Sequence, residues 1–353
     1  MMTPGENLLS TLRRRGFESV PVDLNLCPSQ EENFKRVTGK TDYREYFGLQ
    51  FRSNWMPLKA RSVNWREIYS EKLPEQTDFD AWGVGHSHGS AEAFHMTRMH
   101  HPLKGERSAA DIRNYPFPDF DPKNTAELKR WADDIHAQGL AAVGGMECTI
   151  WETAWYIRGM EELMVDMLSE DPIVELLLDR ITEIACTRAA SYAEAGCDIL
   201  QFGDDIGMQK TPMMKAETWE RWLKPRLARV IGSAKKTKSD IVINYHSCGH
   251  VIPFLDGLIE AGIEVLNPVQ PESMDFAEVY RRTGTRLSYW GTIGTQTTLP
   301  FGKPADVKAA VERNLRICGK KGGIVIGPTH LVEPEVPWDN IIAMVETVKN
   351  FRL

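Results

Sequence analysis

Short apolar runs alternate with longer amphipathic stretches from about residue 139 to the end of the chain. The apolar runs are rich in Val, Ile and Leu, which favours buried β-strands, whereas helical spacing of apolar residues marks the stretches between them. The predicted strands are 140–146, 199–203, 241–246, 264–268, 287–293 and 324–328, and the predicted helices lie near 158–168, 172–195, 218–235, 250–262, 274–284, 304–319 and 337–351. Strands that alternate with helices are expected to pair in parallel.

The amino-terminal part adds a short amphipathic helix over residues 6–15 and a strand over 19–26. Residues 28–138 lack a clean period and are expected to form an irregular excursion of helices and a hairpin that supplies a lid or binding wall. Seven strands are clear, and an eighth within the excursion would complete a (β/α)8 TIM barrel, an α/β fold that suits one domain over residues 1–353. An open doubly wound sheet is the alternative, although no G-x-G-x-x-G follows a strand.

Composition narrows the classes of function. The 353 residues are 42% hydrophobic and 26% charged, and the net charge of −7 with no basic run argues against a nucleic-acid partner. No run of 18 apolar residues or signal-like start occurs, so no membrane span is expected. The six cysteines show no C-x-x-C spacing, which favours a reducing, cytoplasmic setting. The oligomeric state stays open, a homodimer included.

The stretch DIVINYHSCG, residues 240–249, holds the strongest candidate chemistry. It begins as a β-branched strand and ends with His246 and Cys248, which project to one face because alternate strand residues do so. An imidazole and a thiolate on one face are good zinc ligands. The alternative is a buried cysteine beside a hydrogen-bonded histidine.

Other polar residues follow the predicted strands, where a barrel carries its functional groups. Glu147 is a candidate fourth metal ligand or a hydrogen-bond partner, and the pair Asp204-Asp205 suits either helix capping or substrate binding. The remaining candidates at strand ends are Tyr245, Asn267, Gln270, Trp290 and His330.

Four stretches together resemble the uroporphyrinogen decarboxylase superfamily: GDDIGMQKTPMM, NYHSCGHVIPFLDGLIEAGIEVLNPVQ, YWGTIGTQTTLPFG and GGIVIGPTHLVEPEVPWDNI. The resemblance covers residues 139–352 and implies the barrel. Decarboxylases of this superfamily carry an arginine-rich motif early in the chain that holds the substrate's carboxylates. The corresponding stretch here, SVPVDLNLCPSQEE, has no arginine.

The corrinoid-linked methyltransferases, which include methylcobalamin:coenzyme M methyltransferases and O-demethylase components, are the branch that matches at H-x-C. The resemblance implies zinc bound by His246 and Cys248, with His330 standing where that branch has a third, cysteine ligand. A histidine there makes the zinc more Lewis-acidic and suits an oxygen-bearing substrate.

The favoured hypothesis is a zinc-dependent methyltransferase that moves a methyl group between a small methylated substrate, such as a methoxy compound, and the corrinoid of a separate protein. Zinc would bind the heteroatom that carries the methyl group. Asp204 and Tyr245 are assigned to catalysis, and Asp205, Asn267, Gln270 and Trp290 to substrate binding. The alternatives are a metal-free decarboxylase of the porphyrinogen type and a non-catalytic binding protein.

Overall fold

A parallel sheet forms the centre of the computed structural model, which describes residues 1–88, 97–146 and 148–352. Its seven strands, in spatial order, are β1 (Phe51–Asn54), β5 (Ala141–Met146), β6 (Ile199–Gly203), β7 (Val242–His246), β8 (Val265–Asn267), β9 (Ser288–Trp290) and β10 (Ile324–Val325). Every neighbouring pair in this order is parallel. The strand expected inside the irregular excursion is β1.

An eighth element lies beyond β10 and extends the curved sheet. Residues 20–26 run parallel to the segment that follows β10, with single bridges between Val22 and Ile326 and between Leu26 and Val332. The predicted strand over 19–26 is therefore an extended segment with two bridging positions. The α/β, TIM-like architecture predicted from the alternating pattern is confirmed.

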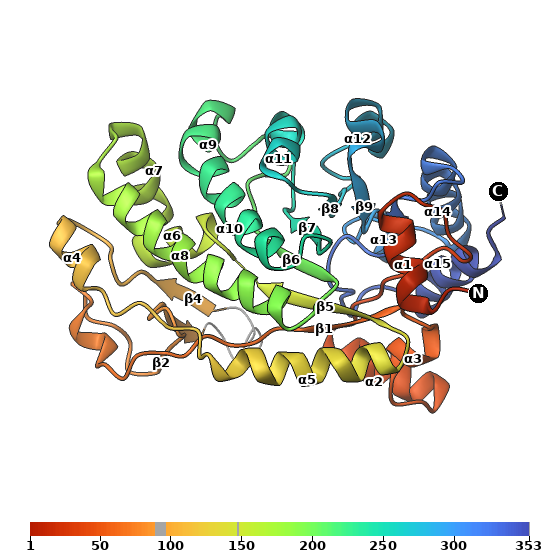
Figure 1. Ribbon diagram of the computed structural model, residues 1–353, viewed down its shortest axis with the longest axis horizontal. Coiled ribbons are helices and arrows are strands. Elements are labelled where there is room, and N and C mark those ends of the chain that lie inside the picture. Colours follow the sequence, from red (N-terminus) through yellow and green to blue (C-terminus); the bar gives the residue numbers. More distant parts are fainter. Residues whose placement is uncertain (89–96, 147, 353) are drawn as a thin grey trace.

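Helices cover the outer face of the sheet (Figure 1). In chain order they are α1 (Pro4–Leu12), α6 (Trp151–Arg158), α7 (Met160–Ser169), α8 (Pro172–Glu194), α9 (Ala216–Trp222), α10 (Lys224–Thr237), α11 (Leu255–Ala261), α12 (Phe276–Thr283), α13 (Thr298–Phe301), α14 (Pro304–Cys318) and α15 (Trp338–Asn350). Local sequence sets their ends: Asp171 accepts the amide of Ile173, and Pro172 occupies the first turn of α8. The termini lie at the same end of the molecule.

Residues 28–138 are more regular than their sequence indicated. They form α2 (Pro28–Thr38), α3 (Tyr43–Phe47), α4 (Ala109–Asn114), α5 (Lys123–Ala137) and an antiparallel sheet of β2 (Thr77–Phe79), β3 (Gly85–His88) and β4 (Thr97–His100). The Ser87 hydroxyl lies 2.8 Å from His100 Nε2 and ties β3 to β4. This small sheet lies at the end of the molecule opposite the termini (Figure 1).

The interior is a continuous apolar core between sheet and helices. Strand β5 is buried along its whole length, as expected of a parallel strand covered on both faces. In the part of the chain that the structure describes, no helix has the length and apolarity needed to cross a membrane.

Candidate metal centre

Strands β6 and β7 bring the candidate ligands together. Gly203 pairs with His246 in the parallel register, so Asp205 and Cys248 each follow two residues beyond that pair, at the same edge of the sheet. The strands approach so closely that a Cβ on Gly203 would lie 1.9 Å from the His246 carbonyl oxygen. Only glycine fits at this position, and the ligand-bearing loops start from it.

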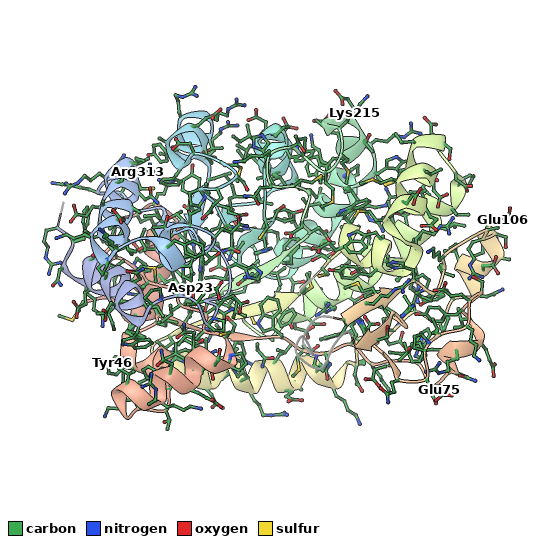
Figure 2. All side chains as sticks on the ribbon, turned by 180° about the vertical axis from the view of Figure 1, so that it is seen from behind. Asp23, Tyr46, Glu75, Glu106, Lys215 and Arg313 are labelled. Carbon is green, nitrogen blue, oxygen red and sulfur yellow. The ribbon has the colours of Figure 1, made fainter. Side chains whose placement is uncertain are left out.

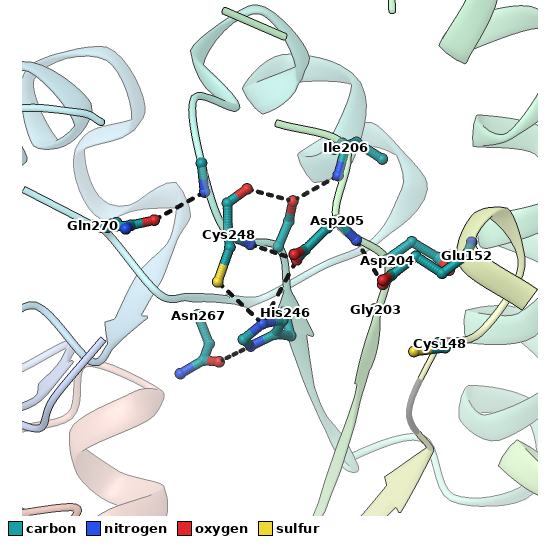
Figure 3. Close-up of polar contacts among 12 residues, drawn as sticks. Cys148, Glu152, Gly203, Asp204, Asp205, Ile206, His246, Cys248, Asn267 and Gln270 are labelled. Atoms are coloured by element: carbon teal, nitrogen blue, oxygen red, sulfur yellow. Dashed lines mark hydrogen bonds and ion pairs between the residues drawn. The ribbon is translucent and has the colours of Figure 1, made fainter. Parts of the chain in front are cut away.

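We call Asp205, His246 and Cys248 the metal-ligating cluster, because their donor atoms could together hold a metal ion. Cys248 Sγ lies 3.5 Å from His246 Nε2, and Asp205 Oδ1 lies 3.7 Å from the same nitrogen. One ligand atom from each residue lies within 4.8 Å of the other two. Figure 3 shows the three side chains converging from adjacent strands. Nitrogen, sulfur and oxygen donors at this separation suit a zinc ion.

Asn267 fixes the histidine in the tautomer that a metal needs. Asn267 Oδ1 lies 2.6 Å from His246 Nδ1, and Asn267 Nδ2 donates to the Trp290 carbonyl at 2.8 Å, which sets the orientation of the amide. The oxygen therefore faces the ring, and Nδ1 must carry the proton. The Nε2 lone pair is left facing Cys248 and Asp205, as in protein zinc sites where a second residue holds the ligand histidine.

The loops after β6 and β7 are joined by a side-chain and a backbone hydrogen bond. The Cys248 amide donates to Asp205 Oδ1 at 2.8 Å, and the His250 amide donates to the Met208 carbonyl at 2.8 Å. A Cβ on Gly207 would lie 2.5 Å from the His250 nitrogen, and Gly249 adopts a φ of +81°. These glycines permit an approach that side chains would block.

The surroundings of Cys248 are apolar and acidic. Burial, followed by the charges of Asp205 and Glu152, raises the pKa of the Cys248 thiol to about 12. A metal ion would reverse that effect, because a coordinated thiol is deprotonated by the cation's charge. The donor chemistry of these residues therefore fits zinc.

A cavity of about 460 Å³ opens beside the cluster. His246 and Asp205 line one wall, and Asp23 and Asn25 belong to another. The remaining lining residues are Trp55, Met146, Cys148, Glu152, Gln201, Phe202, Gly203, Asn267, Pro328, Thr329, His330 and Leu331. The cavity is large enough for a small aromatic or aliphatic compound.

Glu152 is a cavity residue that the sequence analysis missed. Its carboxylate accepts the Asp205 amide at 2.9 Å and the Tyr156 hydroxyl at 3.0 Å, and that hydroxyl also lies 3.5 Å from Cys148 Sγ. Burial, and then Asp205, raises the pKa of Glu152. The sequence does contain a signal that could have identified Glu152: it is an acidic residue in the first turn of α6, the helix that follows strand β5.

Comparison with known proteins places the chain in a family. The family model of uroporphyrinogen decarboxylase (URO-D) matches residues 103–351. The chain belongs to the URO-D family.

Curated relatives in the URO-D family are distant. The uroporphyrinogen decarboxylase of Coxiella burnetii is 23% identical over 188 residues, and that of Thermus thermophilus is 24% identical over 184 residues. These matches cover 53% and 52% of this chain and 50% of each relative, so the chain spans about half the length of the curated relatives it matches.

A solved structure matches the URO-D family chain over nearly its full length. A methyltransferase from Methanosarcina mazei superposes with a TM-score of 0.66 and 19% identity, covering 99% of this chain and 98% of that one. At this identity the likeness shows the shared fold.

The predicted catalytic pair, Asp204 and Tyr245, is buried and is not among the residues that line the cavity. Asp204 is 5% exposed, and its carboxylate accepts the amides of Ile150 and Glu152 at 2.9–3.0 Å. Burial, and then Glu152, raises the pKa of Asp204 to about 7, although the backbone amides lower it. The Tyr245 hydroxyl donates to the Asp204 carbonyl at 3.4 Å, and burial raises its pKa. These contacts match the helix-capping alternative for Asp204. A catalytic role for Asp204 or Tyr245 stays a prediction.

The predicted ligand set differs from the cluster. His330 lines the cavity, and partial burial and then the charge of His246 lower its pKa, but its ring is not among the described ligand atoms that meet within 4.8 Å. Asp205, assigned to substrate binding, belongs to the cluster, and metal ligation by His330 stays a prediction. Glu147 lies outside the described residues.

Of the predicted substrate-binding residues, Asp205 and Asn267 line the cavity, whereas Gln270 and Trp290 are not among its lining residues. Gln270 Oε1 accepts the Gly249 amide at 3.1 Å, and Trp290 is 2% exposed, with Nε1 donating to Asp23 Oδ2 at 2.7 Å. Asn267 both lines the cavity and holds His246. Direct contact of Gln270, Trp290 or Asn267 with a substrate stays a prediction.

Proposed function

We propose that this chain is a zinc-dependent methyltransferase that moves a methyl group between a small methylated substrate, such as a methoxy compound, and the corrinoid of a separate protein. The cluster of Asp205, His246 and Cys248 beside a 460 Å³ cavity carries the proposal. The name of the Methanosarcina protein that shares the fold adds support.

In this proposal His246 Nε2, Cys248 Sγ and an Asp205 oxygen would hold the zinc, and His330 remains a candidate for a further position. When bound, zinc would act as a Lewis acid on the heteroatom that carries the methyl group. Asn267 keeps the His246 lone pair aimed at the metal position through its 2.6 Å contact with Nδ1. The fixed backbone around Cys248 keeps the thiolate in place.

We assign the corrinoid to a partner protein. Residues 134–139, DIHAQG, do match the D-x-H-x-x-G pattern typical of corrinoid-binding proteins. That histidine lies in the last turn of α5, and its Nε2 lies 2.8 Å from Asp198 Oδ2. A helix end with its imidazole engaged by a carboxylate differs from the open ligand loop that a corrinoid would need, so this match does not change the assignment.

The test is metal content together with methyl transfer. Elemental analysis of the protein purified without chelator is expected to give about one zinc per chain, and Cys248→Ala is expected to lose it. Cys186→Ala, a half-buried cysteine on α8, is the matched control and should keep the metal. Demethylation of methoxybenzenes by cob(I)alamin, followed by the absorbance of methylcobalamin, should need the metal. Equal zinc in wild type and Cys248→Ala, or none in either, would overturn the proposal.

The metal-free decarboxylase is the second candidate, because the curated relatives carry that name. The described residues that line the cavity include no lysine or arginine to hold a polycarboxylate. Release of carbon dioxide from uroporphyrinogen by chelator-treated protein would favour the decarboxylase over the methyltransferase.

A further inference from the structure

The wall of the cavity opposite the metal-ligating cluster carries an acidic side chain that the proposed chemistry does not use. Residues 20–26 stand at the end of the strand order, beyond β10, whereas β7 stands in its middle. Because the sheet curls, Asp23 and His246 line the same cavity from different walls. Figure 2 shows Asp23 within the outline of the molecule, whereas Glu75, Glu106, Lys215 and Arg313 lie at its periphery.

Asp23 is held by a hydrogen bond but has no ion-pair partner among the described residues. Trp290 Nε1 donates to Asp23 Oδ2 at 2.7 Å, and the Trp290 ring packs edge-on against Phe51 at 4.9 Å between centroids. Burial raises the pKa of Asp23, and the hydrogen bond from Trp290, a backbone hydrogen bond at Leu24 and the charge of Arg44 lower it in part, in that order of size. A half-buried carboxylate without a partner charge is partly desolvated, so a cationic guest would stabilise its ionised form.

The other carboxylates that line the cavity add to its acidic character. Asp23, Glu152 and Asp205 supply three carboxylates, and no lysine or arginine occurs among the described lining residues. If zinc is bound by one thiolate and the Asp205 carboxylate, those two charges are balanced, and Asp23 and Glu152 remain. Trp55, which is 41% exposed, adds an aromatic face that can stack on a cation.

An unpartnered amide lies on the inner face of the sheet nearby. Asn244 is 0% exposed, and neither polar atom of its side chain has a hydrogen-bond partner among the described residues. It shares a face with His246, two residues earlier on β7, and pairs in register with the cavity residue Gln201. A buried amide without a partner indicates a polar guest or a bound water at this level of the barrel.

We propose that Asp23 is a substrate-binding residue that selects a methylated compound with a positively charged amine at the end away from its methyl group. The amine would contact Asp23 and the face of Trp55, while the methyl-bearing end lies at the cluster. This inference rests on the proposed function for the identity of the methyl-bearing end. The positive charge at the other end of the substrate is inferred from the residues that line the cavity, without the proposed function.

Three probes of one shape and different charge test the inference by calorimetry: 4-methoxybenzylamine, 4-methoxybenzyl alcohol and 4-methoxybenzoate. The amine is expected to bind about tenfold more tightly than the alcohol, and the benzoate most weakly, because a carboxylate in a shielded site favours a cation. Asp23→Asn should lower the affinity for the amine about tenfold and leave the alcohol within about twofold. Asp133→Asn, an exposed aspartate on α5, should change neither.

The outcomes separate this inference from the proposed function. Preference for the amine that disappears in Asp23→Asn supports the inference even if no methyl group reaches cob(I)alamin, in which case only the methyltransferase proposal fails. Methyl transfer with equal binding of amine and alcohol, or with tightest binding of the benzoate, would overturn the inference and leave the methyltransferase. Preference for the amine that persists in Asp23→Asn would also overturn it.

Discussion

The two walls of the cavity are built in different ways. On the β6–β7 wall each candidate ligand is fixed by a neighbour. Asn267 holds the His246 ring. The Asp205 carboxylate accepts a hydrogen bond from the Cys248 amide, and the Asp205 amide donates to Glu152. On the wall formed by residues 20–26, Asp23 is held by one side-chain hydrogen bond, from Trp290. Networks of this kind give geometric precision, which metal binding requires.

The difference indicates a division of labour. A metal site loses affinity when its ligands turn by small angles, so the β6–β7 wall is cross-linked at every step. A wall that only selects charge can work with one carboxylate, since electrostatic attraction depends weakly on orientation. The energetic cost of this wall is a half-buried carboxylate that has no ion-pair partner among the described residues.

The largest effect is expected from Asp205. Asp205→Ala should weaken zinc binding by about 100-fold or more, since losing a ligand costs more than losing the support of one. His330→Ala should weaken it less, because the described His330 ring lies outside the 4.8 Å cluster. Competition with a zinc-binding dye would measure both, with His136→Ala on α5 as the control. A larger loss in His330→Ala than in Asp205→Ala would restore the ligand set predicted from the sequence.

A smaller effect on the same wall is expected from Asn267. Asn267→Ala should weaken zinc binding about 10- to 100-fold, because the His246 ring loses the acceptor that fixes its tautomer. The same dye competition applies, and Asn124→Ala, at the surface near the start of α5, is the matched control. Unchanged zinc affinity would show that the ring is held by its packing alone.

The smallest effect is expected on the opposite wall, in stability. Burial raises the pKa of Asp23 above its ordinary value, although Trp290 lowers it in part. The folded state therefore binds the proton more strongly than the unfolded state, and this residue's contribution to stability falls as pH rises from about 4 through the folded pKa. Asp23→Asn should raise Tm by about 1–3 °C at neutral pH, and the gain should vanish near pH 4. Calorimetry at both pH values measures it, and a lower Tm at neutral pH would contradict it.

The sequence predicted the barrel well because its strands are locally marked. Runs such as Ile241–Val242–Ile243 are β-branched and are followed by polar residues, so the sequence indicates both the strand and where it ends. Strand β1, with sequence FRSN, has a half-exposed pattern and no β-branched residue, and only its pairing with β5 defines it. Helix α5 carries apolar residues at 128, 132 and 135, a helical spacing that charged neighbours obscured.

The site was predictable to the extent that it is local. His246 is the last residue of β7, and Cys248 follows two residues later in the loop, so the short H-x-C spacing alone indicated that the two side chains lie close together. Asp205 joins them through the register between β6 and β7, which pairs Gly203 with His246 and is not contained in either strand's own sequence. Asp23 lies more than 200 residues before His246 in the chain, and only the curl of the sheet brings it to the cavity.

The joined loops after β6 and β7 have a consequence for motion. Gly207 and Gly249 let the two backbones touch, and the His250 amide, the Cys248 amide and the Ile206 amide all donate across the junction. Amides linked in this way open together, so their hydrogen exchange should follow one slow cooperative event rather than independent loop fraying. The ligand geometry thus persists in the metal-free protein, and metal uptake requires no loop to fold.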